Sequence, residues 1–301
     1  MKNPKKILIA NRGVIAIRAL RAAKELGYEV ASVYSTVDKD QKHLKLSDEA
    51  ICIGPATAKD SYMNDAAIIS AAELVGADAI YPGFGFLAEN ASFAEKCKES
   101  GFEFVGPDSK VIEVMGDKIK AKELIKSLGV PTVPGYAGKI ESQNQIENIV
   151  EQIEYPVIVK ASAGGGGRGM RVVNKRDELW DAIIGAQNEA KVAFGNDEVF
   201  IEKYLKKPRH IEIQIFGDGK GRVVHLYSRD CSLQRKYQKI IEEAPAKNLN
   251  QEKLSEIQNI CVAACSELKY KGAGTLEFLY EDNEFYFIEM NTRIQVEHTV
   301  T

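Results

Sequence analysis

Residues Phe285-Tyr-Phe-Ile-Glu-Met-Asn-Thr-Arg-Ile-Gln-Val-Glu-His298 follow a second apolar run, Gly274-Thr-Leu-Glu-Phe-Leu-Tyr280, across the turn-like segment Glu281-Asp-Asn283. Two apolar runs separated by a short polar turn predict a β-hairpin. Side chains two positions apart share one face of a strand. If the chain stays extended, one face therefore carries five polar side chains: Glu289, Asn291, Arg293, Gln295 and Glu297. Such groups are costly to bury beside an apolar segment unless something binds them, so the hairpin predicts a binding site.

The register of this hairpin decides whether a further acid, Glu277, meets Glu289. A three-residue loop at 282–284 pairs Glu277 with Glu289, whereas a two-residue loop pairs Glu277 with Ile288 and turns its side chain to the other face, barring a bulge. Two carboxylates about 4 Å apart repel by roughly 4 kcal/mol at an effective dielectric constant of about 20. Mg²⁺ removes that repulsion, because it binds one or two carboxylates together with substrate phosphates. The alternative is a structural ion pair between Glu289 and Arg293.

Length and composition indicate a globular protein of two or three domains. The chain has 301 residues, of which 45% are hydrophobic and 28% are charged. The net charge of −3 argues against general nucleic-acid binding. The apolar runs are shorter than the ~18 residues of a membrane span, and the apolar run near the N-terminus is too short for a signal peptide. The five cysteines include no CxxC pair, which predicts reduced thiols in a cytoplasmic protein.

The N-terminal part of the chain is predicted to form a Rossmann-like layer. A strand at 6–10, a helix at 14–26 and a strand at 28–34 form a βαβ unit, which favours a parallel sheet. The same pattern continues with helices at 66–75 and 89–100 and strands at 79–81 and 102–105. The chain has no GxGxxG motif here, and Gly83-Phe-Gly85 alone indicates only a turn, so dinucleotide binding is not predicted.

A basic helix and a glycine-rich hairpin come next. Residues 117–128 predict a helix, and Lys118 at its start either faces solvent or reaches a bound anion. Four consecutive glycines lie between two β-branched runs and between the cations Lys160 and Arg168; they are Gly164, Gly165, Gly166 and Gly167. Consecutive glycines let backbone N–H groups turn towards an anion, so this loop predicts phosphate binding, with a flexible linker as the alternative.

Three further segments carry polar groups. The strand at 199–201 runs into Glu202-Lys-Tyr-Leu205, whose backbone can read the edge of a flat heterocycle. The next strand alternates, so that one face carries His210, Glu212 and Gln214. The donor-rich run from Asp230 to Lys239 predicts either a pocket lining or a solvated face. An amphipathic helix at 251–269 precedes the hairpin.

Six motifs occur in order along the whole chain. They are Ile9-Ala-Asn-Arg-Gly13, Tyr81-Pro-Gly-Phe-Gly-Phe-Leu-Ala-Glu-Asn90, Lys160 with Gly164-Gly-Gly-Gly-Arg-Gly-Met170, Glu202-Lys-Tyr-Leu205, Gln234 to Lys239, and Glu289-Met-Asn-Thr-Arg-Ile-Gln-Val-Glu-His298. In combination they resemble biotin carboxylase, an ATP-grasp enzyme family, and the last motif is highly specific to it. The chain departs from the pattern at Tyr237, where most members of the family have a histidine facing the nucleotide.

The resemblance implies an α/β fold of the α+β ATP-grasp type. It implies a Rossmann-like N-terminal domain at 1–115, a linker and lid with the glycine loop at 116–203, and an incomplete C-terminal ATP-grasp lobe at 204–301. Residues 131–203 are expected to move as one unit, the lid. Members of the family continue past Thr301 with another arginine for bicarbonate and biotin and much of a dimer surface, so the resemblance also implies a truncated chain.

The resemblance further implies a role for each matching residue. The ATP phosphates would be held by Lys118, Lys160 and Gly164 to Gly167. The rest of the nucleotide would contact Glu202, Lys203, Tyr204 and Leu205 (adenine), His210 (ribose), Gln234 and Tyr237. Two Mg²⁺ or Mn²⁺ ions would be held by Glu277, Glu289 and Asn291. Bicarbonate would be bound by Lys239, Arg293, Gln295 and Val296. Glu297 would deprotonate it, with Arg293 stabilising the charge of this base.

The implied activity is the first half-reaction of a biotin-dependent carboxylase, in which biotin is carboxylated with ATP and bicarbonate through carboxyphosphate. The implied partners are a biotin carboxyl carrier protein or domain, a carboxyltransferase and a second copy in a homodimer, with no nucleic acid and no membrane. The implied setting is cytoplasmic fatty acid biosynthesis. Two alternatives remain open: a truncated Mg-ATP-binding module that does not carboxylate biotin, and another ATP-grasp ligase.

Overall fold

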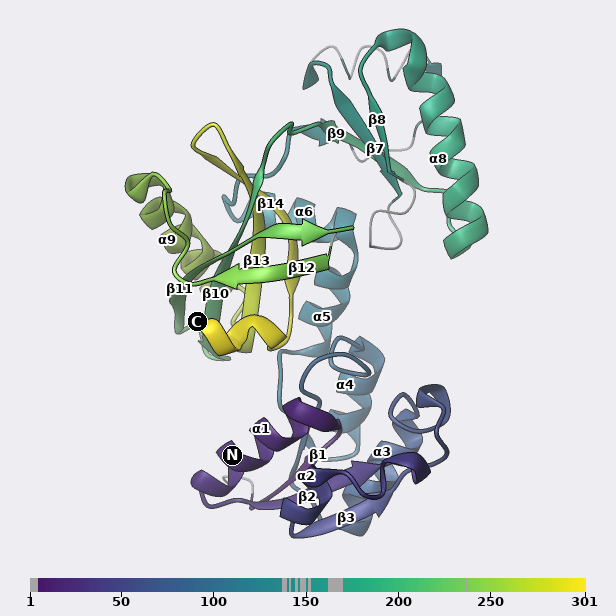
Figure 1. The fold of residues 1–301 in the computed structure, drawn as a ribbon, viewed down its shortest axis with the longest axis vertical. Coiled ribbons are helices and arrows are strands. Elements are labelled where there is room, and N and C mark those ends of the chain that lie inside the picture. Colours follow the sequence, from purple (N-terminus) through teal and green to yellow (C-terminus); the bar gives the residue numbers. More distant parts are fainter. Residues whose placement is uncertain are drawn as a thin grey trace.

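The computed structural model describes residues 5–136, 140, 142, 143, 146, 150, 153–161, 170–236 and 238–301. Figure 1 shows three tiers along the long axis: an N-terminal sheet at the bottom, a larger sheet in the middle and a small sheet flanked by one long helix at the top. Each tier has hydrophobic core residues of its own. None of the described helices has the length and apolar character that crossing a membrane requires.

The N-terminal tier confirms the predicted Rossmann-like layer. Its five strands are all parallel, in the order β3-β2-β1-β4-β5, with bounds β1 Lys6–Ile9, β2 Glu29–Tyr34, β3 Glu49–Cys52, β4 Ala79–Tyr81 and β5 Glu103–Phe104. The connecting helices are α1 Gly13–Glu25, α2 Lys42–Leu46, α3 Asp65–Leu74 and α4 Ala91–Glu99, with short 3-10 turns η1 Thr36–Asp38 and η2 Ala58–Asp60. The elements β3 and α2 were not predicted, because they are too short to show a period of their own.

The turns that follow β1 and β4 meet where the strand order reverses. The Asn11 side-chain amide donates to the carbonyl oxygens of Pro82 and Phe84, at 2.7 and 2.8 Å. Open α/β sheets bind ligands at this kind of edge, beyond the carboxyl ends of their strands. The Pro82–Phe86 turn is thereby held against the first turn of the fold, and its Phe84 and Gly85 face the central cavity described below.

Two consecutive helices lead from this tier to the middle one: α5 Ser109–Gly116 and α6 Lys118–Ser127. The Asp117 side chain caps α6 by accepting from the backbone N–H groups of Ile119 and Lys120. The predicted basic helix is therefore confirmed, with Lys118 as its first residue. One face of α6 packs into the core of the middle tier through Ala121 and Ile125.

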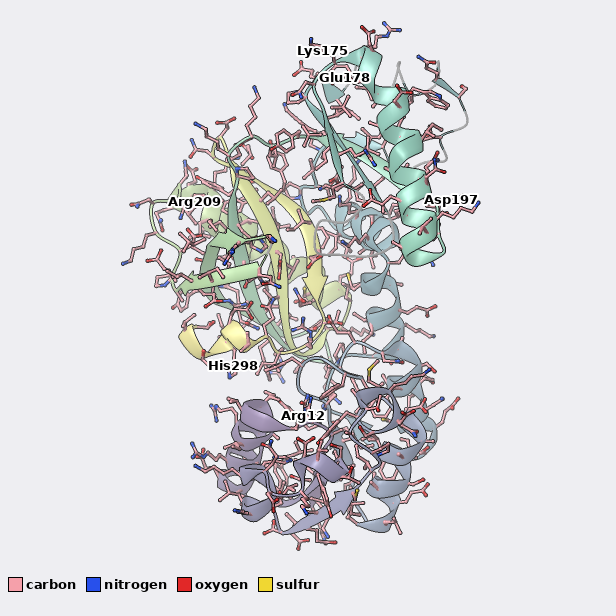
Figure 2. The ribbon with its side chains drawn as sticks, turned by 45° about the vertical axis from the view of Figure 1, so that its right-hand side comes forward. Arg12, Lys175, Glu178, Asp197, Arg209 and His298 are labelled. Atoms are coloured by element: carbon pink, nitrogen blue, oxygen red, sulfur yellow. The ribbon has the colours of Figure 1, made fainter. Side chains whose placement is uncertain are left out.

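The upper tier is a four-stranded antiparallel sheet, in the order β6-β9-β7-β8. Its strands are β6 Gly135–Tyr136, β7 Val157–Ala161, β8 Arg171–Val173 and β9 Val199–Lys203. The helix α8 Leu179–Phe194 follows the short turn η3 Arg176–Glu178 and packs along the sheet, where Figure 2 labels Lys175, Glu178 and Asp197 around it. The predicted glycine loop, Gly164 to Gly167, lies outside the described residues.

The middle tier is a five-stranded antiparallel sheet, in the order β12-β11-β10-β13-β14. The strands are β10 Arg209–Asp218, β11 Val223–Arg235, β12 Gln238–Glu243, β13 Lys271–Glu281 and β14 Glu284–Asn291, and the helix α9 Gln251–Glu267 covers one face. On β10 the side chains of Ile211, Ile213 and Ile215 point into the core, which leaves the alternate polar residues on the opposite face.

The β13–β14 hairpin brings Glu277 and Glu289 together, although not through the three-residue loop. Glu281 pairs with Glu284 around a two-residue turn in which Asp282 and Asn283 both have positive φ, the geometry that tight hairpins favour. A register shift after Glu277 then skips Ile288, so that Glu277 pairs with Glu289. A bulge therefore restores the common face that the two-residue loop alone would have destroyed.

The expectation that the chain stays extended past this hairpin is wrong. β14 ends at Asn291, and Glu297 lies in a short 3-10 helix, η4 Val296–Val300. After Asn291 the chain consequently bends back towards the sheet. This bend, and not a single strand face, brings Arg293, Gln295 and Glu297 to the sheet. Their arrangement is a product of this turn, which the two-residue spacing did not predict.

Candidate active site

A cavity of about 770 Å³ lies where the three tiers meet. Most of the predicted site residues line it: Lys118, Lys160, Lys203, Tyr204, Leu205, His210, Gln234, Lys239, Glu277, Glu289, Asn291, Arg293, Gln295, Val296 and Glu297. Glu202 lies directly behind the wall, with its carboxylate bound to the lining residue Lys160. Tyr237, like Gly164 to Gly167, falls outside the described residues. Segments far apart in the sequence thus converge on one space of a size suited to a nucleotide.

The upper part of the cavity is apolar on facing walls. Side chains from the upper and middle tiers line it: Val133, Ile158, Met170, Phe200, Leu205, Leu279 and Ile288. Such walls suit a flat heterocycle, as small-molecule pockets are lined mainly by apolar groups with a few polar ones. The sequence analysis identified only Leu205 of this set for binding, because apolar strand residues that line a cavity look like ordinary core residues.

The linker Glu202–Leu205 is anchored by its backbone. The N–H of Lys203 donates to the Pro134 carbonyl and that of Tyr204 to the Pro156 carbonyl, both at 2.9 Å. These bonds fix the exit of β9 from the upper tier at the cavity wall. The segment therefore presents Tyr204 and Leu205 to the cavity from a constrained backbone.

The carboxylate of Glu202 is shared by two lysines. Lys160 on β7 donates to one oxygen at 2.7 Å, and Lys122 on α6 pairs with the other. Burial and the neighbouring lysines lower the pKa of Lys122 to about 7, and burial and Lys118 lower the pKa of Lys160 to about 8. Lys122 was not predicted as a site residue, since one lysine in a basic helix resembles its solvated neighbours.

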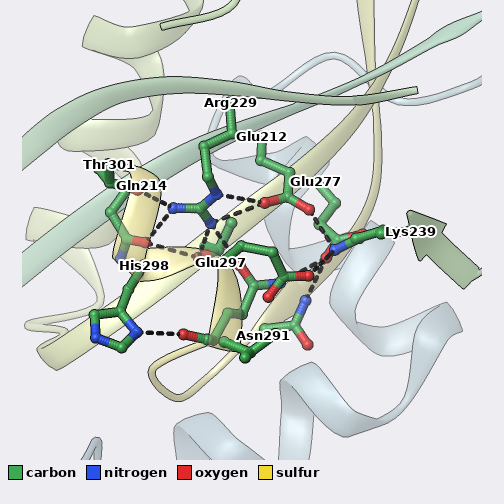
Figure 3. A network of polar contacts seen from close by, with 12 residues as sticks. Glu212, Gln214, Arg229, Lys239, Glu277, Asn291, Glu297, His298 and Thr301 are labelled. Atoms are coloured by element: carbon green, nitrogen blue, oxygen red, sulfur yellow. Dashed lines mark hydrogen bonds and ion pairs between the residues drawn. The ribbon is translucent and has the colours of Figure 1, made fainter. Parts of the chain in front are cut away.

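The lower part of the cavity holds a cluster of acids around Lys239 (Figure 3). The Lys239 ammonium contacts Glu277 at 2.9 Å, Glu297 at 3.2 Å and Glu212. Burial alone would lower the pKa of Lys239, but Glu277 and Glu212 outweigh it and raise the pKa well above its ordinary value. Lys239 is consequently a permanent cation, and Glu297 is held by it rather than by the predicted Arg293.

His210 completes the cluster on the other side of Glu277. Its Nε2 lies 2.8 Å from one Glu277 oxygen and 3.5 Å from Glu212. Burial lowers the pKa of His210, but the nearby carboxylates of Glu212 and Glu277 outweigh this effect and raise the pKa to about 9. The side-chain amide of Gln234 lies 3.1 Å from Nδ1 of the same ring. The imidazole is therefore held in place from both sides at the cavity wall.

Arg229 anchors this cluster from beneath, and the sequence analysis missed it. Its guanidinium is fully buried and donates to Glu212, Gln214, Thr275, Gln295 and Thr301, at 2.6 to 3.2 Å. Burial would raise the pKa of Glu212, but His210, Lys239 and Arg229 together keep it far below the ordinary range. Arg229 thereby fixes the orientation of both Glu212 and the predicted bicarbonate ligand Gln295.

The predicted metal ligands offer a suitable donor set. Glu277, Glu289 and Asn291 supply two carboxylates and an amide oxygen, the hard oxygen donors that Mg²⁺ prefers. Burial and the nearby Glu277 raise the pKa of Glu289, the repulsion that a divalent cation would relieve. In the structure Glu277 accepts from the amides of Asn291 and Gln295, at 2.7 and 2.8 Å. A second group within reach of one ion consists of His210, Glu212 and Glu277.

Arg293 is paired with an acid of the N-terminal tier. Its Nε donates to Glu89 at 2.6 Å, and a second nitrogen donates to the Asn291 side-chain oxygen at 2.9 Å. The alternative ion pair between Glu289 and Arg293 is thus replaced by Glu89–Arg293, while Glu289 lies 3.9 Å from Lys118. Glu89 belongs to a motif that carried the family resemblance, but nothing in its spacing indicated this contact.

Comparison with known protein families divides the chain in two, near the end of the N-terminal tier. The family model described as "Biotin carboxylase, N-terminal domain" matches residues 3–112. The model described as "Carbamoyl-phosphate synthase L chain, ATP binding domain" matches residues 117–301. The two matches cover nearly the whole sequence, and the second spans more than half of it.

Individual relatives point to one family over nearly the whole chain. The chain is 56% identical to the biotin carboxylase of Haemophilus influenzae, over 98% of this chain and 66% of that protein. It is 49% identical to a biotin carboxylase from Campylobacter jejuni solved as a β,γ-ATP complex, with a TM-score of 0.92 over 99% of this chain and 67% of the other.

A third relative was solved with ligands. The biotin carboxylase domain dimer of Hydrogenobacter thermophilus 2-oxoglutarate carboxylase, in complex with MgADP, ADP and bicarbonate, is 48% identical, with a TM-score of 0.89 over 99% of this chain and 66% of that one. The chain thus spans about two thirds of the length of each of these three proteins.

Proposed function

The chain belongs to the biotin carboxylase family, and we propose that it carries out the ATP- and bicarbonate-dependent carboxylation of biotin. The observation that carries this proposal is the convergence of Lys239, Glu297 and Arg293 beside the Glu277–Glu289 pair in one cavity. A phosphoryl donor and a small oxyanion need adjacent sites of this kind, because phosphoryl transfer depends on positioning and on neutralising charge.

The nucleotide is proposed to lie along the upper and middle parts of the cavity. Its adenine would sit between the apolar walls beside Tyr204 and Leu205, and its phosphates would extend towards Lys118 and Lys160. His210, Gln234 and the undescribed positions Tyr237 and Gly164 to Gly167 would complete the nucleotide contacts. Glu277, Glu289 and Asn291 would hold Mg²⁺ or Mn²⁺, which would offset the negative charge of the phosphates.

Bicarbonate is proposed to bind next to Lys239, between Arg293, Gln295 and the backbone at Val296. Glu297 would take the proton of bicarbonate, and a carbonate oxygen would then attack the γ-phosphorus while the bond to the departing ADP oxygen breaks. The product, carboxyphosphate, would split into CO₂ and phosphate. That phosphate would take the proton from N1 of biotin, and N1 would bond to the CO₂. Lys239 and Arg293 would stabilise the developing oxyanions.

We further propose the partners and the cellular setting of this reaction. The biotin would be carried on a carrier protein or domain and then serve a carboxyltransferase, and a second copy would form a homodimer. We place the reaction in the cytoplasm and in fatty acid biosynthesis. We also propose the units 1–115, 116–203 and 204–301 as domains, with residues 131–203 moving as a lid, and the separate core of the upper tier supports the movement of this part as one body.

Bicarbonate-dependent ATP hydrolysis with free biotin tests the function. We expect wild-type turnover, and we expect Glu297→Gln to lose roughly 10²- to 10⁴-fold in rate, the usual contribution of a general base. ADP binding by calorimetry serves as the control, since Glu297 is not expected to touch the nucleotide. Wild-type protein that binds ADP without turnover would instead be a Mg-ATP-binding module. Turnover with another acceptor but not with biotin would indicate a different ATP-grasp ligase.

A further inference from the structure

One buried cluster at the cavity contains two lysines and only one carboxylate. The side chain of Glu202 is 3% exposed, and its two oxygens are occupied by Lys160 and Lys122. Both lysines line the cavity, with side chains 21% and 16% exposed. One carboxylate compensates one lysine, so this cluster of three residues carries a surplus positive charge whenever both lysines are protonated. A surplus of charge in a nearly buried cluster is costly unless a ligand of the opposite sign joins it.

The two lysines come from different elements and are not equivalent. Lys122 lies one helical turn after Lys118 on α6, and its ammonium also sits 4.8 Å from the centre of the Phe200 ring. Lys160 projects from β7 of the upper tier and is proposed above as a phosphate ligand. Lys160 gives up its bond to Glu202 if its ammonium moves towards a phosphate. If Lys160 were the only partner, its departure would strand a buried carboxylate, which is strongly unfavourable.

We propose that Lys122 is the standing counterion of Glu202 and thereby releases Lys160 to the phosphates of a nucleotide. The inference rests on the proposed function, because it needs a phosphate-bearing ligand in this cavity. Lys122 acts through Lys160 and is a positioning residue. Its effect is therefore specific to ligands that carry phosphate, whereas a lysine that only supports the fold would affect every ligand of the cavity equally.

The test compares ADP with adenosine, which has the same base and ribose but no phosphate. Calorimetry on the full chain gives both dissociation constants for wild type, Lys122→Met, Lys122→Arg and the control Lys120→Met, a lysine on the exposed side of the same helix. We expect Lys122→Met to weaken ADP binding by on the order of tenfold, since Glu202 then retains Lys160, and to leave adenosine binding unchanged. Lys122→Arg should restore ADP binding, and Lys120→Met should match wild type.

The double variant Lys122→Met with Glu202→Gln keeps the test decisive even if Lys122→Met folds poorly. A glutamine needs no counterion, so Lys160 is free in this variant and ADP affinity should return towards that of wild type. The inference is overturned if Lys122→Met binds ADP normally, if it loses ADP and adenosine equally, or if the double variant is no better than the single one. Wild-type protein that fails to bind ADP would overturn the proposed function, and this inference with it.

Discussion

The buried carboxylates at the two ends of the cavity have different sets of cationic partners. At the lower end, Glu212, Glu277 and Glu297 face Lys239, Arg229 and His210, so that acids and bases are matched in number and joined in one network. At the upper end, Glu202 alone faces Lys122 and Lys160. A matched network has one arrangement and resists change, whereas an unmatched cluster is ready to accept an anion. The difference suggests that the lower end fixes the geometry around the proposed bicarbonate and metal sites, and that the upper end is prepared for the phosphates of a nucleotide.

The strongest test of the lower end is the removal of Arg229. Arg229→Met leaves Glu212 without its deepest partner in a fully buried position, so we expect a loss of about 3–5 kcal/mol in the free energy of unfolding. Urea denaturation measures it, and Arg222→Met serves as the control because that side chain is almost fully exposed. Arg229→Met combined with Glu212→Gln should recover part of the loss. An unchanged stability in the single variant would show that the network does not hold this end of the cavity.

The proposed metal site at the lower end of the cavity depends on Glu289. Glu289→Gln removes one of the two paired carboxylates, so we expect the gain in ADP affinity on adding Mg²⁺ to fall by roughly 10- to 100-fold. Calorimetry with ADP in Mg²⁺ and in EDTA gives this gain. Glu284→Gln, on the same strand but paired with Lys253 at the surface, should behave as wild type. Equal gains in ADP affinity in both variants would show that Glu289 does not bind the metal.

The affinity for ADP should depend on pH through the lysines at the upper end of the cavity. Burial and Lys118 lower the pKa of Lys160 to about 8, so its cation is present at neutral pH and is lost as the pH rises through that value. Because phosphate binding needs the protonated lysine, we expect ADP affinity to fall by up to about tenfold per pH unit above 8. Adenosine binding, measured from pH 6.5 to pH 9.5, is the reference and should stay flat. An ADP affinity that stays level across this range would contradict the assignment of Lys160.

The smallest effect is expected at the contact between tiers. Glu89 and Arg293 are 40% and 22% exposed, and ion pairs of that kind contribute about 0.2–1 kcal/mol. Glu89→Gln should therefore leave stability nearly unchanged while raising the KM for bicarbonate about two- to five-fold, as Arg293 loses its orientation. Steady-state ATPase assays report it, with the exposed Glu99→Gln on α4 as the matched control. A change in kcat alone would argue against a positioning effect.

Short-range patterns anticipated much of the fold. The βαβ order, the alternation on β10 and the apolar hairpin are visible in the sequence, because each follows the period of its own element. Periodicity did not decide the register of the hairpin, because a two-residue turn with a bulge and a three-residue loop both pair Glu277 with Glu289. The spacing beyond Asn291 was also misleading, because the chain turns into η4 where the pattern assumed a strand.

The sequence by itself determined the polar residues available to the site and, through motifs in a fixed order, the family to which the chain belongs. Only the tertiary structure decided which of them touch. Arg229, Lys122 and Glu89 each contact a site residue more than 15 positions away in the chain, and no local period records such a contact. Charge pairing in a buried site depends on distance in space and on exclusion of water, and both arise only when separate segments pack together.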